Sequence, residues 1–205
     1  MPTDWATLTR ALWPLAREPD LAPWNRGPIE DILPAKLRPA AVLVGLVERD
    51  DGLRMLFTRR TDQLRHHAGE VSFPGGAAEA VDAGRIATAL RETGEEIGIP
   101  DSAIEPVGFL DPMATVTGFH VLPVVARLDA GYRPVLDPGE VAEVFELPLD
   151  FLLEADTLFH QRMPWQGRVR RFAELRTWPG APHPRIWGAT AMIVENLRTR
   201  LEAVR

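Results

Sequence analysis

Residues 75–99 read GGAAEAVDAGRIATALRETGEEIGI, a glycine pair followed by a strongly helical segment. The small and apolar residues of the segment recur at helical steps of four and three, at Ala83, Ala87, Leu90, Gly94 and Ile97. This spacing predicts an amphipathic helix. We expect the helix to begin at Asp82 or just beyond it and to end near Gly98, which is well suited to a helix C-terminus.

The predicted helix carries three carboxylates on one face. Glu92, Glu95 and Glu96 occupy positions i, i+3 and i+4, which are neighbours on a helix surface. Like charges at this spacing repel each other by roughly 0.2–0.5 kcal/mol per pair, and a hard cation reverses the sign of that interaction. Mg²⁺ and Mn²⁺ accept ligands that are all oxygen. The pattern therefore indicates an enzyme that holds Mg²⁺ or Mn²⁺ against a phosphorylated small molecule; the alternative is a solvated acidic helix face.

The rest of the chain mixes predicted strands and helices without a regular repeat. Residues 1–39 are interpreted as a helix over Thr3–Arg17 and a Pro-rich connector, packed on a domain of residues 40–205. Strands are predicted at Ala40–Glu48, Leu53–Arg59, Glu70–Phe73, Ile104–Leu110, Val121–Leu128 and Val141–Leu147. Later segments are predicted as a helix at Phe151–Leu158, a hairpin of Arg168–Phe172 with Glu174–Trp178, and a helix at Gly188–Val204. The mixture indicates a single α+β domain with a mixed sheet.

The composition of the chain limits the possible classes of function. The 205 residues are 45% hydrophobic and 25% charged, which suits one globular domain. A net charge of −6 argues against general binding to nucleic acid or to an anionic membrane. The absence of Cys excludes disulfides, thiolate zinc sites and a thiol nucleophile. We expect no signal peptide and no membrane span, and hence a cytoplasmic protein, either a monomer or a homodimer.

The acidic helix and the loop before it resemble the Nudix box, the signature of Nudix hydrolases. The half of the box written REuxEExGu, where u is a bulky apolar residue, is matched by Arg91, Glu92, Glu95, Glu96, Gly98 and Ile99. Thr93 stands where an apolar residue is usual. Asp82 stands where the family usually has Glu, and its spacing to Arg91 is one residue longer than the common form. The departures at Asp82 resemble one subfamily, the coenzyme A pyrophosphatases.

A second and more specific signature of that subfamily, roughly LLTxRSxxxRxxxGxxxFPGG, precedes the box. It is matched at the right spacing by Leu56, Thr58, Arg60, Arg65, Gly69, Phe73, Pro74, Gly75 and Gly76. Phe57 replaces a Leu, and Thr61 replaces the small residue. Three later segments are also similar to the subfamily: 117–125, 145–149 and 186–191. The resemblance thus covers about residues 40–197 and includes two signatures that share a Pro-Gly-Gly loop.

The resemblance implies a fold, a reaction and a set of roles. The fold is the Nudix fold, an α/β/α sandwich, and the reaction is hydrolysis of a nucleoside diphosphate linked to another group. For the subfamily, coenzyme A is cut to adenosine 3′,5′-bisphosphate and 4′-phosphopantetheine. Glu92 and Glu96 are expected to be the principal metal ligands, with Glu95 as a further ligand or a holder of water. Arg91 is expected to orient a carboxylate; the alternative is an ordinary i, i+4 ion pair with Glu95.

The two glycines and Asp82 each have two alternative roles. Gly75 and Gly76 are expected to bring the backbone close to a metal or phosphate, or to form a simple tight turn. Asp82 either supports the box by hydrogen bonding or caps the helix. Glu79 has no firm role.

Arg60 and Arg65, with His66 and His67 nearby, form a basic cluster in an acidic protein. We expect the two arginines to contact the phosphates of coenzyme A, including its 3′-phosphate, because Arg binds phosphate through a bidentate fork. The alternative is a solvated basic loop.

Two more residues are candidates for the pocket, and two other functions are alternatives to hydrolysis of coenzyme A. His120 and Trp187 are candidates to shape the pocket, with packing as the alternative. The general base is not identified; Glu95 or an acid from a loop could serve. A rival function is hydrolysis of ADP-ribose, a dinucleotide or a nucleoside triphosphate. A second rival is a non-catalytic nucleotide-binding module, although such modules usually lack part of the acidic triplet.

Overall fold

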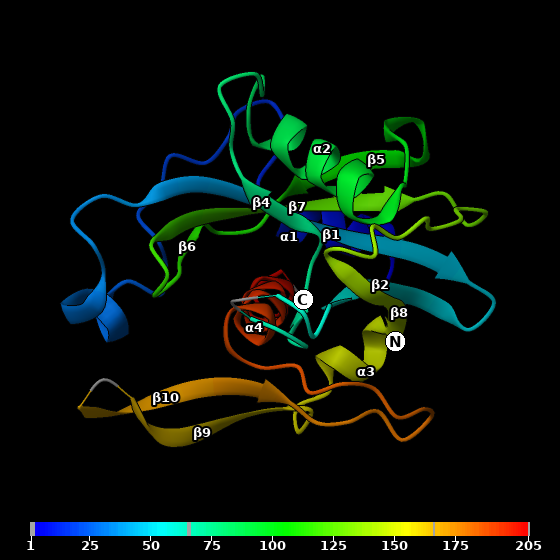
Figure 1. Ribbon diagram of the computed structural model, residues 1–205. Helices are drawn as coiled ribbons and strands as arrows, with labels where there is room; N and C mark the ends of the chain where they lie inside the picture. The colour runs from blue at the N-terminus through cyan, green and yellow to red at the C-terminus, as the bar shows by residue number, and fades with distance from the viewer. Residues whose placement is uncertain (1–2, 65–66, 166, 205) are drawn as a thin grey trace.

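The structure is a computed structural model that describes residues 3–64, 67–165 and 167–204 (Figure 1). Within these residues, eight strands form one sheet and two form a separate hairpin. The strands of the sheet are β1 (Arg38–Arg49), β2 (Gly52–Arg60), β3 (Val71–Ser72), β4 (Gly75–Ala77), β5 (Ile104–Phe109), β6 (Met113–Ala114), β7 (Phe119–Leu128) and β8 (Val141–Pro148). The hairpin consists of β9 (Leu158–Trp165) and β10 (Arg168–Leu175).

The sheet is mixed, as predicted. Its main order is β3-β2-β1-β7-β5, with β4 on β1, β6 on β7 and β8 on β2. β1 and β7 run parallel to each other, whereas the other strand pairs are antiparallel. β4 pairs with β1 through Ala41↔Gly76 and Val42↔Gly75. The glycine pair therefore lies beside the central strand of the sheet.

Helices cover both faces of the sheet. They are α1 (Trp5–Ala11), η1 (Gly27–Ile32), α2 (Arg85–Ile97), η2 (Asp101–Ala103), α3 (Leu149–Leu153) and α4 (Gly188–Glu202). Figure 1 shows α2 on one side of the sheet, α4 on the other, and the β9–β10 hairpin beyond α4. The predicted α+β class and the three α/β/α layers are confirmed, with the hairpin as an addition.

β1 supplies side chains to two hydrophobic cores because successive residues of a strand point to opposite faces. Ala41, Leu43 and Val47 belong to the cluster that includes residues of α2. Val44 and Leu46 belong to the cluster that includes residues of α4. Burial on both faces explains why this segment reads as a nearly continuous apolar run.

α2 ends as the sequence predicts and begins just beyond Asp82, at Arg85. Gly98 adopts a left-handed conformation with φ 65°, and its N–H donates to the carbonyl of Gly94. The N-cap is Gly84, not Asp82. A carboxylate from the N-terminal connector replaces the missing cap, because the Arg85 N–H donates to Glu18 Oε1 over 2.6 Å. An acceptor at this position stabilises the helix N-terminus.

Several predicted elements differ in extent. The first helix covers only Trp5–Ala11, and the helix expected at Phe151–Leu158 is the shorter α3. The predicted hairpin is wrong: its strands are β9 and β10, and the turn lies at Gly167, with φ 76°, rather than near Ala173. The earlier turn is favoured because it lets Ala173 and Leu175 enter the core beside α4.

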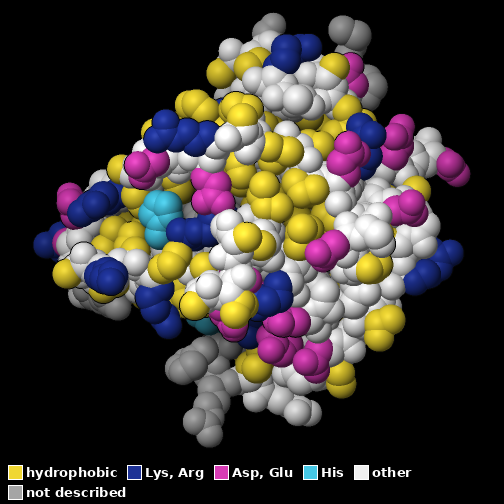
Figure 2. Space-filling view, turned by 90° about the horizontal axis from the view of Figure 1, so that it is seen from above, with side chains coloured by type: hydrophobic (Ala, Val, Ile, Leu, Met, Phe, Trp, Pro, Cys, Tyr) yellow, Lys and Arg dark blue, Asp and Glu magenta, His cyan; other side chains and the backbone are white. Residues whose placement is uncertain are grey.

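The N-terminal segment is anchored to the sheet by long-range hydrogen bonds. Asn25 exchanges two hydrogen bonds of 2.8 Å with the backbone of Ala114, and the Trp13 N–H donates to the Phe109 carbonyl. The division of the chain at residue 40 stays a prediction; β1 itself begins at Arg38. No described helix has the length and apolar character needed to cross a membrane. Figure 2, which looks down on the α2 layer, shows acidic and basic side chains interspersed around hydrophobic ones.

Candidate active site

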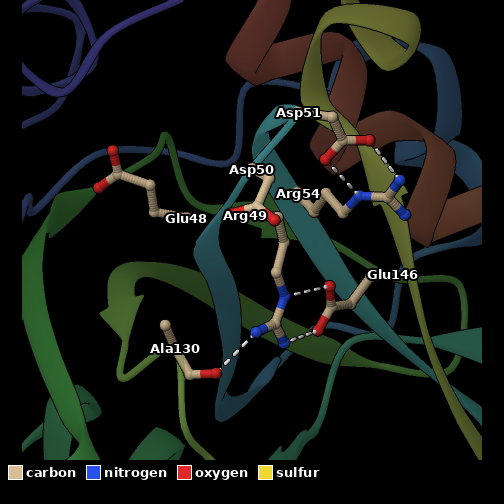
Figure 3. A pocket seen from close by; sticks show the side chains of 7 residues that line it. All are labelled: Glu48, Arg49, Asp50, Asp51, Arg54, Ala130 and Glu146. Carbon is tan, nitrogen blue, oxygen red and sulfur yellow. Dashed lines mark hydrogen bonds and ion pairs between the residues drawn. The ribbon is translucent and has the colours of Figure 1, made fainter.

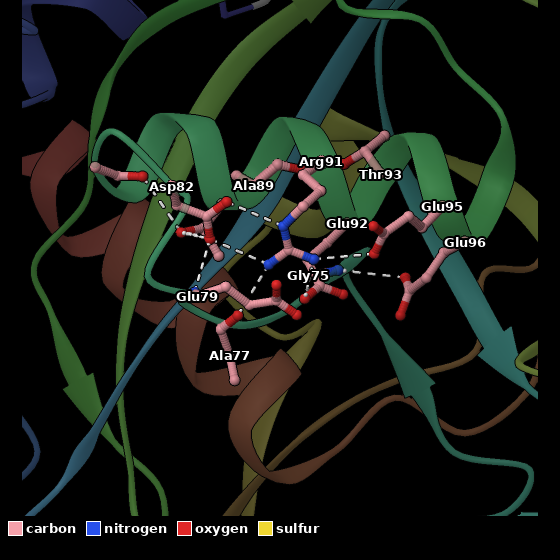
Figure 4. Close-up of polar contacts among 12 residues, drawn as sticks. Gly75, Ala77, Glu79, Asp82, Ala89, Arg91, Glu92, Thr93, Glu95 and Glu96 are labelled. Atoms are coloured by element: carbon pink, nitrogen blue, oxygen red, sulfur yellow. Dashed lines mark hydrogen bonds and ion pairs between the residues drawn. The ribbon is translucent and has the colours of Figure 1, made fainter.

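The acidic face of α2 meets the glycine pair of β4. Glu96 Oε2 accepts a hydrogen bond of 3.3 Å from the Gly75 N–H (Figure 4). A Cβ atom on Gly76 would lie 2.6 Å from Glu92 Oε1, so only glycine lets the carboxylate approach. Gly75 has φ 152°, and a Cβ there would lie 2.4 Å from the Ala41 carbonyl oxygen. The glycine backbone therefore lies close to two carboxylates, and its expected approach to a metal or phosphate stays a prediction.

Glu96 is a buried acid with few neighbouring groups that stabilise its negative charge. Its side chain is 4% exposed, and Arg60 Nη1 lies 3.8 Å from Oε1. Burial raises the pKa of Glu96 to about 8, and repulsion from Glu140 and Glu92 adds to the effect. Burial also raises the pKa of Glu92. Two neighbouring carboxylates with raised pKa values form a site where a cation would be stabilised.

Arg91 is the centre of the polar network behind the acids (Figure 4). It donates to Asp82 Oδ1 over 3.0 Å, to Glu92 Oε1 over 3.0 Å and to Glu95 Oε2 over 2.9 Å. It also donates to the Ala77 carbonyl over 3.0 Å. The guanidinium thus joins the helix to the β4 segment and holds the Glu92 carboxylate in one orientation.

Asp82 serves as a hydrogen-bonding support rather than a helix cap. Its carboxylate accepts from Arg91, from the Thr88 hydroxyl over 2.9 Å and from the Glu79 N–H over 2.9 Å. Hydrogen bonding to Arg91 is the main reason that the pKa of Asp82 lies well below its usual range. Of the two alternatives weighed for this residue, the geometry favours the supporting role.

The three acids of the triplet do not share one environment. Glu92 and Glu96 face the glycine loop, whereas the Glu95 side chain is 60% exposed and paired with Arg91. Among the described residues, no group of three acidic or His side chains is arranged to hold a metal ion. Mg²⁺ is commonly bound by one or two carboxylates together with water and substrate phosphates. The pair of Glu92 and Glu96 fits this mode of binding.

The basic cluster is visible only in part. Arg60, at the end of β2, reaches the acid pair through its contact with Glu96. Arg65 and His66 lie outside the described residues. His67 is paired with Glu70 over 2.9 Å rather than with the acids. The structure therefore brings Arg60, but not His67, to the acidic face.

Glu140 is a site residue that the sequence did not single out. Its carbonyl accepts from the Thr61 N–H over 2.9 Å, at the end of β2. Its negative charge is among the causes that raise the pKa of both Glu92 and Glu96. The only sequence signal is an acid after Pro138 and Gly139, which resembles many exposed turns. Pairing of β2 with β8 brings this acid to the site.

Two other predicted pocket residues have structural contacts. His120 Nε2 lies 3.4 Å from the Leu21 carbonyl in the N-terminal connector. The Trp187 ring packs against Phe172, and the Arg185 guanidinium lies over it. These contacts favour the packing alternative for both residues.

A polar hollow at the β1–β2 turn contains two arginine–carboxylate pairs (Figure 3). Arg49 donates to both oxygens of Glu146, over 3.0 and 2.6 Å, and to the Ala130 carbonyl over 2.6 Å. Arg54 forms a bidentate pair with Asp51. The Arg49–Glu146 pair joins the β1–β2 turn to β8. Because Glu48 and Asp50 also line the hollow, its lining has more carboxylates than guanidinium groups and is unsuited to an anionic substrate.

Comparison with known proteins decides the family. The NUDIX domain family matches residues 36–165. The Nudix hydrolase NudL of Klebsiella pneumoniae (strain 342), described as uncharacterized, is 41% identical over 167 residues, or 81% of this chain and 84% of that protein. NudL of Enterobacter sp. (strain 638) is 39% identical over 165 residues, or 80% of this chain and 83% of that protein. This chain belongs to the Nudix hydrolase family.

A solved structure supports the same fold. A MutT/nudix family protein from Enterococcus faecalis superposes with a TM-score of 0.50 and 16% identity, over 83% of this chain and 64% of that one. Nudix hydrolases generally use divalent metal ions such as Mg²⁺ and bind small-molecule nucleotide substrates. As a member of the family, this chain acts on nucleoside diphosphate derivatives.

Proposed function

We propose that this Nudix hydrolase cleaves the pyrophosphate bond of coenzyme A or its derivatives. The products are adenosine 3′,5′-bisphosphate and 4′-phosphopantetheine, or its acyl form. The observation that carries the proposal is the contact between the Arg60 guanidinium and the buried carboxylate of Glu96. Arg60 belongs to the segment from Leu56 to Gly76 that resembles coenzyme A pyrophosphatases, and its guanidinium lies beside a proposed metal ligand.

In this proposal the acids hold Mg²⁺ or Mn²⁺. Glu92 and Glu96 are the principal ligands, and Glu95 is a further ligand or holds water. A divalent ion at this position supplies charge neutralisation and orientation of the pyrophosphate oxygens. Arg91 keeps Glu92 in place through their hydrogen bond of 3.0 Å. Gly75 and Gly76 bring the backbone close to Glu96 and Glu92, the two proposed ligands.

The remaining residues act on the substrate and on water. Arg60 and Arg65 bind phosphate groups, with Arg65 assigned to the 3′-phosphate. Water attacks a phosphorus atom, the bond to the bridging oxygen breaks, and a general base receives the proton of the water. Glu140 is our preferred base because Glu95 is already paired with Arg91. The negative charge of Glu140 acts on both members of the acid pair.

A substrate panel tests this proposal against the rival substrates. Coenzyme A, ADP-ribose, a dinucleotide and a nucleoside triphosphate are each incubated with protein and Mg²⁺ or Mn²⁺, and the products are analysed by chromatography. The proposal requires the highest kcat/KM for coenzyme A or a derivative. Preference for ADP-ribose or a dinucleotide would show that this compound, and not coenzyme A, is the substrate. No turnover of any compound would favour a non-catalytic nucleotide-binding module.

The assignment of Arg65 has a separate test. Arg65→Ala is compared with the unaltered protein on coenzyme A and on dephospho-coenzyme A, which lacks the 3′-phosphate. A larger loss of kcat/KM on coenzyme A supports the assignment. Equal losses on the two substrates would remove it. Arg133→Ala, at a solvent-exposed position that bonds only nearby backbone carbonyls among the described residues, is the matched control.

Three further expectations remain predictions. They are a cytoplasmic location, the absence of a nucleic-acid or membrane partner, and a monomeric or homodimeric state. Light scattering on the purified protein distinguishes the two oligomeric states.

A further inference from the structure

The β9–β10 hairpin is a basic element in an acidic protein. It lies beyond α4, on the side of the molecule away from α2 and its acids (Figure 1). Arg162 on β9 and Arg171 on β10 are directly opposite each other in the strand register. Like charges at opposed positions of a sheet are destabilising. The energetic cost of placing two exposed guanidinium groups at opposed positions indicates that the pair has a function.

The hairpin and its surroundings contain other arginines, and each of these has an acid as a partner. They form ion pairs with acids: Arg168 and Arg170 with Asp31, Arg176 with Asp156, and Arg185 with Glu174. In contrast, Arg162 has no hydrogen bond or ion pair with a described residue, and Arg171 bonds only to His160. The opposed pair thus consists of the arginines of the hairpin that lack an acid within the described chain.

His160 holds Arg171 in place. Arg171 Nη2 lies 2.9 Å from His160 Nδ1, and His160 Nε2 lies 3.2 Å from Glu195 Oε1 on α4. A guanidinium can only donate, so Nδ1 accepts and the neutral imidazole has its proton on Nε2, the ring nitrogen beside Glu195. This chain from carboxylate to imidazole to guanidinium fixes one arginine without neutralising it.

These side chains surround a recess. His160, Arg162, Val169 and Arg171 line a hollow of about 570 Å³. We propose that this recess is a binding site for a small phosphate-class anion, separate from the acid pair on α2. Two unneutralised guanidinium groups, one of them held by His160, match the charge and the oxygen geometry of a phosphate.

The surroundings favour a small ligand over a polyanion. Asp31, Glu174 and Glu195 lie on the hairpin or on elements that contact it, and the whole chain has a net charge of −6. A nucleic acid or an anionic membrane would meet these carboxylates, whereas a single phosphate group needs only the two arginines.

Calorimetric titration of metal-free protein with inorganic phosphate tests the proposal. Arg162→Gln and Arg171→Gln are compared with the unaltered protein and with Arg176→Gln, a control that removes a neighbouring, already neutralised arginine. We expect one phosphate per chain, an affinity lowered roughly tenfold or more by either of the first two substitutions, and no change in the control. Circular dichroism verifies that each variant is folded.

Two further titrations identify the source of the phosphate. Adenosine 3′,5′-bisphosphate binding more tightly than inorganic phosphate, with the same dependence on Arg171, assigns the site to a nucleotide phosphate; equal affinities assign it to free phosphate. No binding of either anion, or equal binding in all four proteins, would overturn the proposal. Tighter, Arg171-dependent binding of a DNA oligonucleotide would also overturn it. Because no metal is present, the outcome is independent of the proposed hydrolysis.

Discussion

Glu96 shows at the scale of one residue how the fold produces a need for a cation. The side chain is 4% exposed, accepts a hydrogen bond from the Gly75 N–H and lies 3.8 Å from the Arg60 guanidinium. Burial raises its pKa from 4.5 to about 8. The folded state therefore binds the proton more tightly than the unfolded chain does. The resulting stabilisation is fully present below about pH 4.5 and is lost as the pH rises through about 8.

We accordingly predict a pH-dependent stability in metal-free protein. The free energy of unfolding should fall by roughly a few kcal/mol between pH 5 and pH 8, because each unit of pKa difference corresponds to about 1.4 kcal/mol. Glu96→Gln should flatten this dependence, whereas Glu48→Gln, at an exposed position, should retain it. Urea unfolding across the pH range measures both. Parallel curves for Glu96→Gln and the unaltered protein would contradict the account.

Gly76 offers a test of the contact between β4 and the acids. An added Cβ would lie 2.6 Å from the Glu92 carboxylate, so Gly76→Ala should displace this proposed ligand. We predict that Mn²⁺ affinity, measured by calorimetry, drops roughly 10–100-fold, the usual effect of disturbing the support of a ligand. Gly27→Ala is the control, because a Cβ there would have no atom within 4 Å. Equal Mn²⁺ affinity in the two variants would argue against a ligand role for Glu92.

At the scale of elements, α2 is fixed at both ends by distant parts of the chain. Glu18 accepts from the Arg85 N–H at the first turn. At the last turn, the Val135 and Asp137 N–H groups donate to the Ile97 and Glu96 carbonyls over 2.8 and 2.9 Å. Both ends thus gain partners for backbone groups that a helix leaves unpaired.

Removing the Glu18 cap should weaken the whole domain. We predict that Glu18→Ala lowers the free energy of unfolding by about 1 kcal/mol, the typical effect of losing an N-terminal cap. Asp20→Ala, at an exposed position on the same connector, should leave stability within about 0.5 kcal/mol of the unaltered protein. Chemical denaturation measures both variants. An unchanged stability in Glu18→Ala would show that water replaces the carboxylate without loss.

The sequence predicts elements better than it predicts their contacts. The helical spacing of α2 and the apolar run of β1 are strong local signals, and both elements form close to their predicted bounds. The predicted hairpin lies too far along the chain because Glu174–Trp178 has a strand-like composition. The actual turn is marked in the sequence by one residue, Gly167. The approach of Glu18 to α2 spans 67 residues, and no periodicity encodes it.

At the scale of the whole molecule, some contacts of the site could be predicted from the sequence and others could not. The contact of Gly75 and Gly76 with Glu92 and Glu96 could be predicted because one short signature contains both halves. The arrival of Glu140 could not, because it depends on β8 pairing with β2. The outward position of Glu95, whose side chain is 60% exposed, also follows only from three dimensions.

A metal that binds only the folded site should stabilise the whole protein. We predict that Mg²⁺ or Mn²⁺ at about 100 times its dissociation constant raises the free energy of unfolding by about 2.7 kcal/mol at pH 8. The double variant Glu92→Gln, Glu96→Gln should show almost none of this gain, whereas Glu48→Gln should show all of it. Thermal unfolding with and without metal measures the effect. An equal gain in the double variant would place the ion elsewhere.

The most direct measurement is product analysis of coenzyme A incubated with the protein and Mg²⁺ or Mn²⁺, beside Glu96→Gln and a metal-free sample. The account predicts adenosine 3′,5′-bisphosphate and 4′-phosphopantetheine in equal amounts from the unaltered protein with metal. It predicts a loss of turnover by orders of magnitude in Glu96→Gln and in the metal-free sample. Intact coenzyme A in every sample, or equal rates with and without Glu96, would contradict it.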